Sequence, residues 1–249
     1  MKQYILPILF LGTSLFISCD KKEVTGNLTI NGKVEGLKQG VLYLHKIQDT
    51  TIVTLDSIIV KGDSNFSRQF NIDSPEMYYL TLDRGSSNSM DNELMFFAEP
   101  GTITIETTLK KFYSDAKVTG SKNNDIYKEY LKTRSAITDR QNELIIDIIK
   151  AENQNALHQK DSLMALSKKM VARKYLNAVN FALNHKDSDV SPYIALMDLY
   201  DRQIKYLDTI NNSLTIEVKN GHYGKLLEAF IKERKELENE PITTDNQSE

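Results

Sequence analysis

The first half of the chain alternates hydrophobic and polar residues with a period of two. Leu28, Ile30 and Val34 alternate with polar neighbours, which is typical of a half-buried β-strand. Seven further segments have the composition of short strands: residues 41–47, 51–60, 65–72, 78–82, 94–98, 102–107 and 116–119. Turn-forming residues separate them, as in Glu99-Pro100-Gly101-Thr102, where Pro and Gly suit a type II turn. Eight short strands predict an antiparallel β-sandwich or open barrel over residues 27–120.

After Gly120 the hydrophobic spacing lengthens to about 3.6 residues, the period of an amphipathic helix. Two long helices are predicted over residues 125–151 and 156–184, and their short connection indicates an antiparallel hairpin. Shorter helices are predicted over residues 193–200, with Pro192 in the first turn, and 224–238. We therefore predict an α+β fold: the β-sandwich, then a helical region over residues 121–238. The polar, acidic residues 239–249 are expected to form a disordered tail.

An apolar run from Ile5 to Ile17 follows Lys2 at the start of the chain. As a helix it would span about 20 Å, short of the roughly 30 Å hydrocarbon core, so it suits a signal-peptide core better than a membrane-spanning helix. The run ends at Ser18-Cys19, and Cys19 is the only cysteine. This sequence looks like a lipobox, in which signal peptidase II cleaves between Ser18 and Cys19. The alternative is an ordinary secretory signal with an incidental cysteine.

The lipobox interpretation defines the N-terminal organisation. Residues 1–18 are then a lipoprotein signal peptide, and residues 19–26 a polar tether that begins with an acylated Cys19. Diacylglycerol and a palmitate-type chain on Cys19 would supply the two or more chains that stable anchoring to membrane lipid needs. Some related lipoproteins carry an acidic export signal directly after the cysteine, but Lys21 and Lys22 interrupt it here. We therefore expect a lipid-anchored protein of the cell envelope, on the outer membrane and facing the periplasm.

The composition excludes several classes of protein. With 249 residues, 40% of them hydrophobic, the chain can bury a core and is not intrinsically disordered. Its 31 basic and 34 acidic residues give a net charge of −3, so no overall positive field favours nucleic acid. One cysteine excludes a disulfide framework, a CxxC redox pair and a cysteine-based zinc site.

A search for catalytic spacing finds no recognisable motif. His45, His158, His185 and His222 are far apart, and the sequence has no HExxH, GxSxG, GxGxxG or P-loop pattern. We therefore predict no catalytic residue, no metal ligand and no cofactor, and the sequence leaves the ligand-binding residues unknown.

Two other patterns indicate surfaces. The run Lys168–Lys174 holds four basic side chains, interpreted as a solvated helix face or, alternatively, as a contact for anionic headgroups or an acidic partner. The pairs Tyr78-Tyr79 and Phe96-Phe97 place one ring on each face of a sheet, which predicts that the two halves pack together; an exposed ligand-binding patch is the alternative. Four Asp-Ser/Thr segments, at Asp49, Asp56, Asp161 and Asp208, resemble a bacterial O-glycosylation acceptor.

The order of several short motifs resembles a known family. These motifs are, in order, the strand series from Leu28 to Gly36, Phe96-Phe97-x-Glu99-x-Gly101, Val118-x-Gly120-Ser121, residues 184–192 (NHKDSDVSP) and Tyr223-Gly224-Lys225. This series is similar to the β-sandwich domain of unknown function that precedes thioredoxin-like (AhpC/TSA-type) domains in Gram-negative lipoproteins. In that family a helical segment follows the sandwich, as it does here. The longer members continue into a thioredoxin fold with a CxxC pair, which this sequence lacks, so their redox activity is not expected.

These observations favour a non-enzymatic binding or interaction module. An alternative is an accessory role in envelope thiol–disulfide or peroxide metabolism, through a separate thioredoxin-like partner. A hydrolase or glycan-active enzyme whose site has no sequence motif is a third possibility. An envelope protein partner is expected under the first two hypotheses, and nucleic acid under none.

Overall fold

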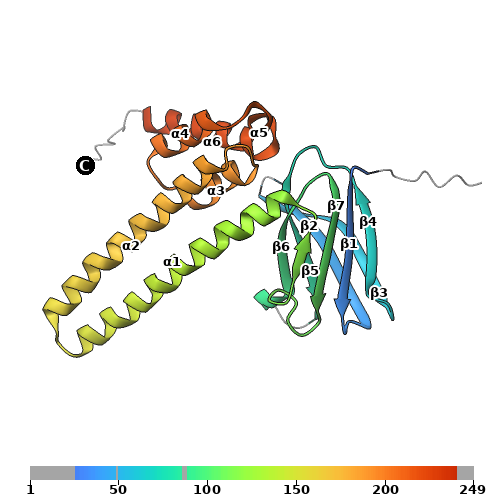
Figure 1. Ribbon diagram of the computed structural model, residues 1–249, viewed down its shortest axis with the longest axis horizontal. Helices are drawn as coiled ribbons and strands as arrows, with labels where there is room; N and C mark the ends of the chain where they lie inside the picture. Colours follow the sequence, from blue (N-terminus) through green and yellow to red (C-terminus); the bar gives the residue numbers. More distant parts are fainter. Residues whose placement is uncertain (1–25, 49, 86–88, 240–249) are drawn as a thin grey trace, which may run out of the picture.

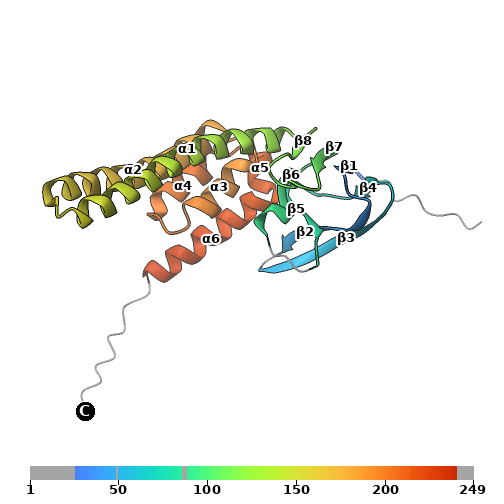
Figure 2. The ribbon, with the colours of Figure 1, turned by 90° about the horizontal axis from the view of Figure 1, so that it is seen from below.

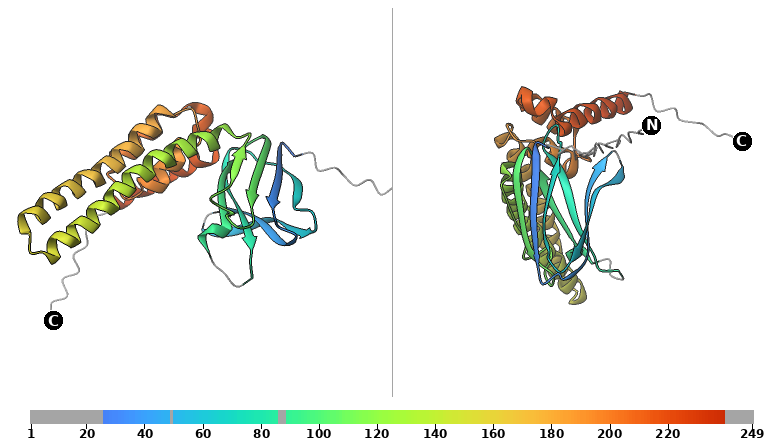
Figure 3. Two further views of the ribbon diagram at one scale, coloured as in Figure 1. Left: turned by 60° about the horizontal axis from the view of Figure 1, so that its bottom comes forward. Right: turned by 90° about the vertical axis from the view of Figure 1, so that its right-hand side faces the viewer.

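The computed structural model describes residues 26–48, 50–85 and 89–239 (Figure 1). The predicted signal peptide, Ser18, Cys19, the tether up to residue 25 and residues 240–249 of the predicted tail lie outside these ranges. Strands occupy one end of the molecule and helices the other (Figures 1 and 3). Within the described ranges, the helices are all too short or too polar to cross a membrane.

Eight strands form two four-stranded sheets. They are β1 (Leu28–Glu35), β2 (Gln39–Gln48), β3 (Thr51–Lys61), β4 (Asn65–Phe70), β5 (Glu76–Asp83), β6 (Glu93–Ala98), β7 (Gly101–Thr108) and β8 (Lys117–Thr119). One sheet has the strand order β4-β1-β7-β8 and the other β3-β2-β5-β6. Each predicted strand has a counterpart, and the predicted α+β fold with an N-terminal sandwich is confirmed.

One sheet is mixed, which differs from the predicted antiparallel arrangement. Strands β1 and β7 run parallel, from Leu28 opposite Gly101 to Glu35 opposite Thr108, whereas every other named pair is antiparallel. Parallel neighbours require a long crossover, and here β2 to β6 provide it. Alternation of residues sets which side chains face the core but says nothing about the direction of a neighbouring strand, so the sequence pattern could not predict this pair.

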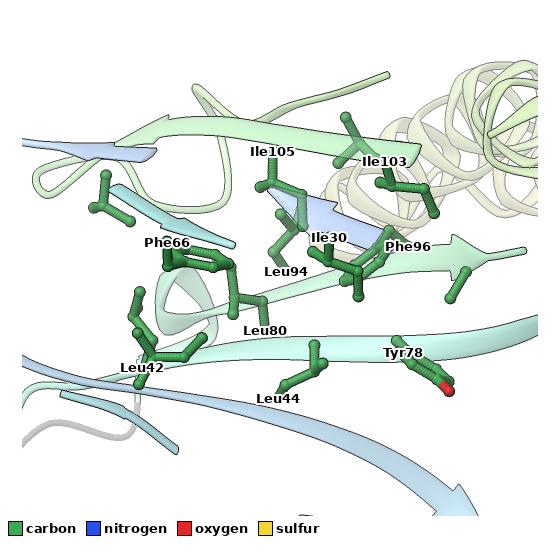
Figure 4. Close-up of a cluster of buried hydrophobic side chains, with 14 of the residues drawn as sticks. Ile30, Leu42, Leu44, Phe66, Tyr78, Leu80, Leu94, Phe96, Ile103 and Ile105 are labelled. Atoms are coloured by element: carbon green, nitrogen blue, oxygen red, sulfur yellow. The ribbon is translucent and has the colours of Figure 1, made fainter. Parts of the chain in front are cut away.

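The two sheets enclose the first hydrophobic core (Figure 4). Side chains from both sheets meet there, among them Ile30 and Ile103 from one sheet and Leu42, Leu80 and Phe96 from the other, each at most 1% exposed. Burial of inward-facing residues from both sheets is the main source of stability for this half.

Six α-helices follow the sandwich in the described chain. They are α1 (Lys122–Asn153), α2 (Leu157–Asn184), α3 (Val190–Asp198), α4 (Ile204–Ser213), α5 (Ile216–Asn220) and α6 (His222–Asn239); a 3-10 turn, η1 (Met90–Asn92), precedes β6. Helix α1 begins three residues before its predicted start, because the Ser121 hydroxyl accepts a hydrogen bond from Asn124 N at 2.9 Å and caps the helix. The sequence analysis did not predict α4 and α5.

The helices form a long hairpin and a compact group at its base. Helices α1 and α2 lie side by side and extend away from the sandwich (Figures 1 and 3), as the predicted hairpin requires. Helices α3 and α4 lie between α2 and α6 (Figure 2). In the far part of the hairpin, Ile137, Leu144 and Met170 form a small separate core.

A cluster of aromatic rings joins the sandwich to the helices. The ring of Phe97 on β6 packs edge-to-face against Tyr127 of α1, Tyr193 of α3 and Tyr223 of α6, with centroid distances of 5.5, 5.2 and 6.0 Å. Its neighbour Phe96 points the other way, into the sandwich core. The prediction that the paired aromatics pack the two halves together is therefore confirmed.

Hydrogen bonds at the same place connect sheet backbone to helix side chains. Phe97 N, on a strand that has no sheet neighbour beyond it, donates to Asn124 Oδ1 at 3.3 Å, and Met77 N donates to Tyr223 Oη at 2.9 Å. The bond from Phe97 N thus pairs a backbone group of an edge strand, and the bond from Met77 N connects α6 to the inner strand β5.

Replacement of Phe97 by Ala tests this junction. We expect Phe97→Ala to lower the free energy of unfolding by about 3–5 kcal/mol, because it removes a fully buried ring and leaves a cavity among three tyrosines. The half-exposed Met95 on the same strand gives the matched control, and Met95→Ala is expected to cost below about 1 kcal/mol. Urea unfolding followed by circular dichroism measures both, and equal midpoints for Phe97→Ala and the parent would contradict the role of this cluster.

Candidate functional site

A cleft of about 1270 Å³ lies where one end of the sandwich meets the bases of the helices. The sandwich contributes Asp73 and Ser74 from the turn before β5, Glu76 at the start of β5, and Glu99 from the turn after β6. The helical wall comes from the start of α1, the loop between α2 and α3, α5 and the first half of α6. Because both halves supply walls, the cleft exists only when they are packed together.

Glu99 joins the two walls at the start of α1. Its carboxylate accepts hydrogen bonds from the backbone N–H groups of Lys122 and Asn123 and from the Asn123 side chain. A carboxylate is favourable at this position, because the N-terminus of a helix carries unpaired N–H groups and a partial positive charge. The protein's own carboxylate therefore occupies the place at which α1 could bind an external anion.

The loop between α2 and α3 is held against α1 through Asn123. Ser188 Oγ donates to Asn123 Oδ1 at 2.6 Å and accepts from Val190 N at 3.2 Å, while Ser191 Oγ donates to Ala182 O at 2.8 Å. Both serines are buried. The hydroxyls of this segment, part of the 184–192 motif, thus fix the loop that carries Asp189.

Two glycines allow α5 and α6 to approach the site closely. A Cβ at Gly221 would lie 2.7 Å from Asp189 Oδ1, and one at Gly224 would lie 2.1 Å from Val218 O. The adjoining His222 N donates to Ser74 Oγ at 2.9 Å, which connects the start of α6 to the sandwich. Gly224 in the Tyr223-Gly224-Lys225 sequence therefore allows α6 to pack closely against α5.

Asp189 is a buried carboxylate with an unsatisfied oxygen. The residue is 8% exposed, and its Oδ1 has no hydrogen-bond partner in the described part of the chain. It precedes α3 but does not cap that helix with its side chain. Burial is the main cause that raises the pKa of Asp189 to about 6; the negative charges of Glu217 and Glu99 contribute to this rise, and a backbone hydrogen bond opposes it.

Glu76 provides a comparison in the same cleft. It is also 8% exposed, but Lys46 Nζ lies 3.1 Å from its Oε2 and supplies the counter-charge. Of the other acidic residues that line the cleft, Asp187 lies 4.0 Å from Lys122 Nζ at the rim. Asp73 and Glu217 form no ion pair within the described ranges.

The net charge of the side chains that line the cleft is therefore negative. Six carboxylates line it (Asp73, Glu76, Glu99, Asp187, Asp189 and Glu217), against two lysines (Lys122 and Lys225) and His222. In the described residues, no group of three His, Cys, Asp or Glu side chains has the geometry of a metal site. What this arrangement can do is attract and neutralise positive charge at several separated points.

The histidines do not form a cluster at the cleft. His222 lines it, whereas His45 stacks on Tyr43 in the sandwich and His185 stacks on Phe181 at the end of α2. His158 lies in the first turn of α2.

The basic run on α2 borders a second, smaller groove. Arg140 of α1 and Lys169 and Arg173 of α2 line a hollow of about 560 Å³ in which Met170 and Leu176 provide apolar surface. Lys169 and Arg173 are exposed, as a solvated face requires. Among the Asp-Ser/Thr segments, Ser57, Ser162 and Thr209 are also exposed, and Asp49 lies outside the described residues.

The sequence analysis did not identify the cleft residues. They come from five separate stretches between Asp73 and Ala229, and no short spacing pattern connects them. The local signals were the family motifs that contain Glu99, the segment 184–192 and Lys225, and none of them indicated a cleft. With 34 acidic residues in the chain, the sequence could not show which ones converge.

The fold and site define an α+β protein in which a two-sheet sandwich and a helical region share one acidic cleft. Residues 28–127 match the sequence model of a domain of unknown function, DUF4369. The match covers all eight strands and the first turn of α1, and so includes Glu99, Asn123 and Tyr127 but no residue of α2 to α6.

Comparisons with characterised proteins add little. No curated protein matches the chain. Among solved structures, sea bream transthyretin in complex with thyroxine is similar over 39% of this chain and 97% of its own, with 10% sequence identity and a TM-score of 0.27. A likeness of that size carries no argument about this protein.

The raised pKa of Asp189 predicts a pH-dependent difference in stability between the parent and Asp189→Asn. A carboxyl group with a higher pKa in the folded state stabilises the fold at low pH, and this contribution is lost as the pH rises from about 4 to about 6. The stability of Asp189→Asn relative to the parent should therefore increase over that range, by at most about 3 kcal/mol. Urea unfolding at several pH values measures it.

The exposed Asp161 on α2 provides the control for this measurement. For Asp161→Asn we expect a difference from the parent that stays constant between pH 4 and pH 7. The prediction is wrong if Asp189→Asn behaves in the same way.

Proposed function

We propose that this protein is a lipoprotein of the cell envelope that binds a ligand in the cleft and catalyses no reaction. The lipoprotein part rests on the apolar N-terminal run followed by Ser18-Cys19, with Cys19 as the acylation site. On this proposal the body is tethered to the outer membrane and faces the periplasm. A tether of a few polar residues would keep the cleft close to the membrane surface.

One observation supports the binding part above all others. The cleft contains a buried carboxylate, Asp189, with an oxygen that no described residue satisfies. A buried polar group without a partner costs stability, so a hydrogen-bond donor or a positive charge of a ligand at this oxygen would be favourable. The hydrogen bonds of Glu99, Asn123 and Ser188 hold its surroundings in place, which reduces the entropy that a ligand would have to overcome.

The size of the cleft agrees with a molecular ligand. Its volume of about 1270 Å³ corresponds to roughly 40 water molecules, far more than a bare ion would need. It also lies at an interface between two structural units, a common place for ligand sites.

The anchoring proposal is tested with Cys19→Ser. We expect the parent protein to fractionate with membranes and its mature N-terminal peptide to carry the mass of the acyl chains. The Ser variant should lose both properties, because a hydroxyl cannot form the thioether. If the Ser variant remains in the membrane fraction, or the parent Cys19 is unmodified, a lipid anchor at this residue is ruled out.

The binding proposal is tested by filling the cleft. Ala229 is exposed on α6 and lines the cleft, so Ala229→Trp introduces an indole there without entering a core. We expect native mass spectrometry of protein isolated from membranes to detect a bound small molecule in the parent and to find it absent from Ala229→Trp. Ala165→Trp, at an exposed position on α2 outside the cleft, is the matched control and should retain it. Identical spectra for all three proteins would contradict a ligand site in the cleft.

A further inference from the structure

We propose that the ligand of this cleft is an organic polycation, a molecule with two or more separated amino or guanidinium groups, one of which neutralises Asp189. This inference rests on the proposed function and specifies the chemical class of the ligand. It is carried by the position of the charges in the cleft and by the two buried acids that line it.

The two buried acids show what is missing. Glu76 and Asp189 are equally buried, and both line the cleft. Lys46 neutralises Glu76 at 3.1 Å, whereas Asp189 has no basic partner among the ion pairs of the described residues. A buried carboxylate that is ionised near neutral pH needs a counter-charge, and the cleft is the open side from which one can come.

The remaining acids surround that position from different elements. Asp73 comes from the sandwich, Glu217 from α5, and Asp187 from the loop that carries Asp189. Glu217 and Glu99 act electrostatically on Asp189, so the negative potential at this point is a property of the cleft as a whole. Charges distributed in this way favour a ligand with several positive groups over one with a single charge.

Other ligand classes fit less well. An anion would meet six carboxylates, and Glu99 already occupies the N-terminus of α1. A bare metal ion needs converging ligands, and no such group of three exists within the described ranges. Lys122 and Lys225 sit on the helical wall and are exposed, and neither forms an ion pair with Asp189.

The experiment is isothermal titration of spermidine into the full-length protein in a non-ionic detergent. We expect spermidine to bind, and binding to weaken as sodium chloride is raised, because salt screens charge pairs. Asp189→Asn keeps the shape of the side chain and removes its charge, and we expect it to weaken binding by about tenfold or more. Asp161→Asn removes one negative charge outside the cleft and should bind like the parent.

Glu217→Gln gives a second test that does not depend on a buried position. It lies at the exposed start of α5, so its folding is not in question, and we expect a smaller loss of spermidine affinity than for Asp189→Asn. Triethylene glycol, a neutral chain of similar length, should not bind. Equal binding of spermidine to the parent and Asp189→Asn, or no binding to the parent, overturns the polycation assignment.

The Ala229→Trp measurement separates this result from the proposed function. If the membrane-derived protein carries a neutral or anionic molecule that Ala229→Trp lacks, the cleft is a ligand site and the polycation class is wrong. If spermidine does not bind and Ala229→Trp has the same spectrum as the parent, both proposals are wrong. Binding of spermidine that Asp189→Asn and Ala229→Trp each weaken supports both.

Discussion

The packing of one phenylalanine against three tyrosines is the contact on which the architecture depends. The side chain of Phe97 projects from the outer face of the sandwich. It packs against Tyr127, Tyr193 and Tyr223, each from a different helix. Edge-to-face contacts between rings have a preferred geometry, so the cluster sets orientation as well as burial. Because α1, α3 and α6 all converge on this side chain, their ends also converge beside the sandwich, and the acidic cleft lies where they do.

Packing the sandwich against the helices buries carboxylates, and not all of their negative charges are compensated by a nearby positive group. Burial of Glu76 is compensated by Lys46, and Glu99 is compensated by the N-terminus of α1. Asp189 is buried by the same packing, and no described basic side chain compensates its charge. Burial of the charged form is unfavourable and is the main reason why the pKa of Asp189 is raised. The loop that carries Asp189 is held in place by the hydrogen bonds of the buried Ser188 and Ser191.

The division of the cleft between two structural units also bears on its specificity. The DUF4369 match spans the sandwich and the first turn of α1, and so includes one wall and Phe97. Of the opposite, helical wall, Lys122 and Asn123 lie inside the match, whereas Asp189, Glu217 and the remaining residues lie beyond residue 127. A relative that shares the sandwich but has different helices would keep one wall and change the cleft on which the proposed function rests, since function lies in the site and not in the fold.

The sequence alone determined the class of fold, because hydrophobic residues that recur every two positions indicate a strand and those that recur about every 3.6 positions indicate a helix. It located all eight strands and the helical hairpin, and from Phe96-Phe97 it predicted that the halves would pack together. Helix α5 was missed because its five residues are too few to show a helical period, whereas α4, with ten residues, was not predicted although it is longer than α3. The parallel pairing of β1 with β7 was missed because the alternation of hydrophobic and polar residues does not depend on the direction of the neighbouring strand. The cleft was decided by tertiary structure alone: its carboxylates are ordinary acidic residues in the chain, and only the convergence of distant turns buries Asp189 beside Gly221, where no base of the described residues neutralises it.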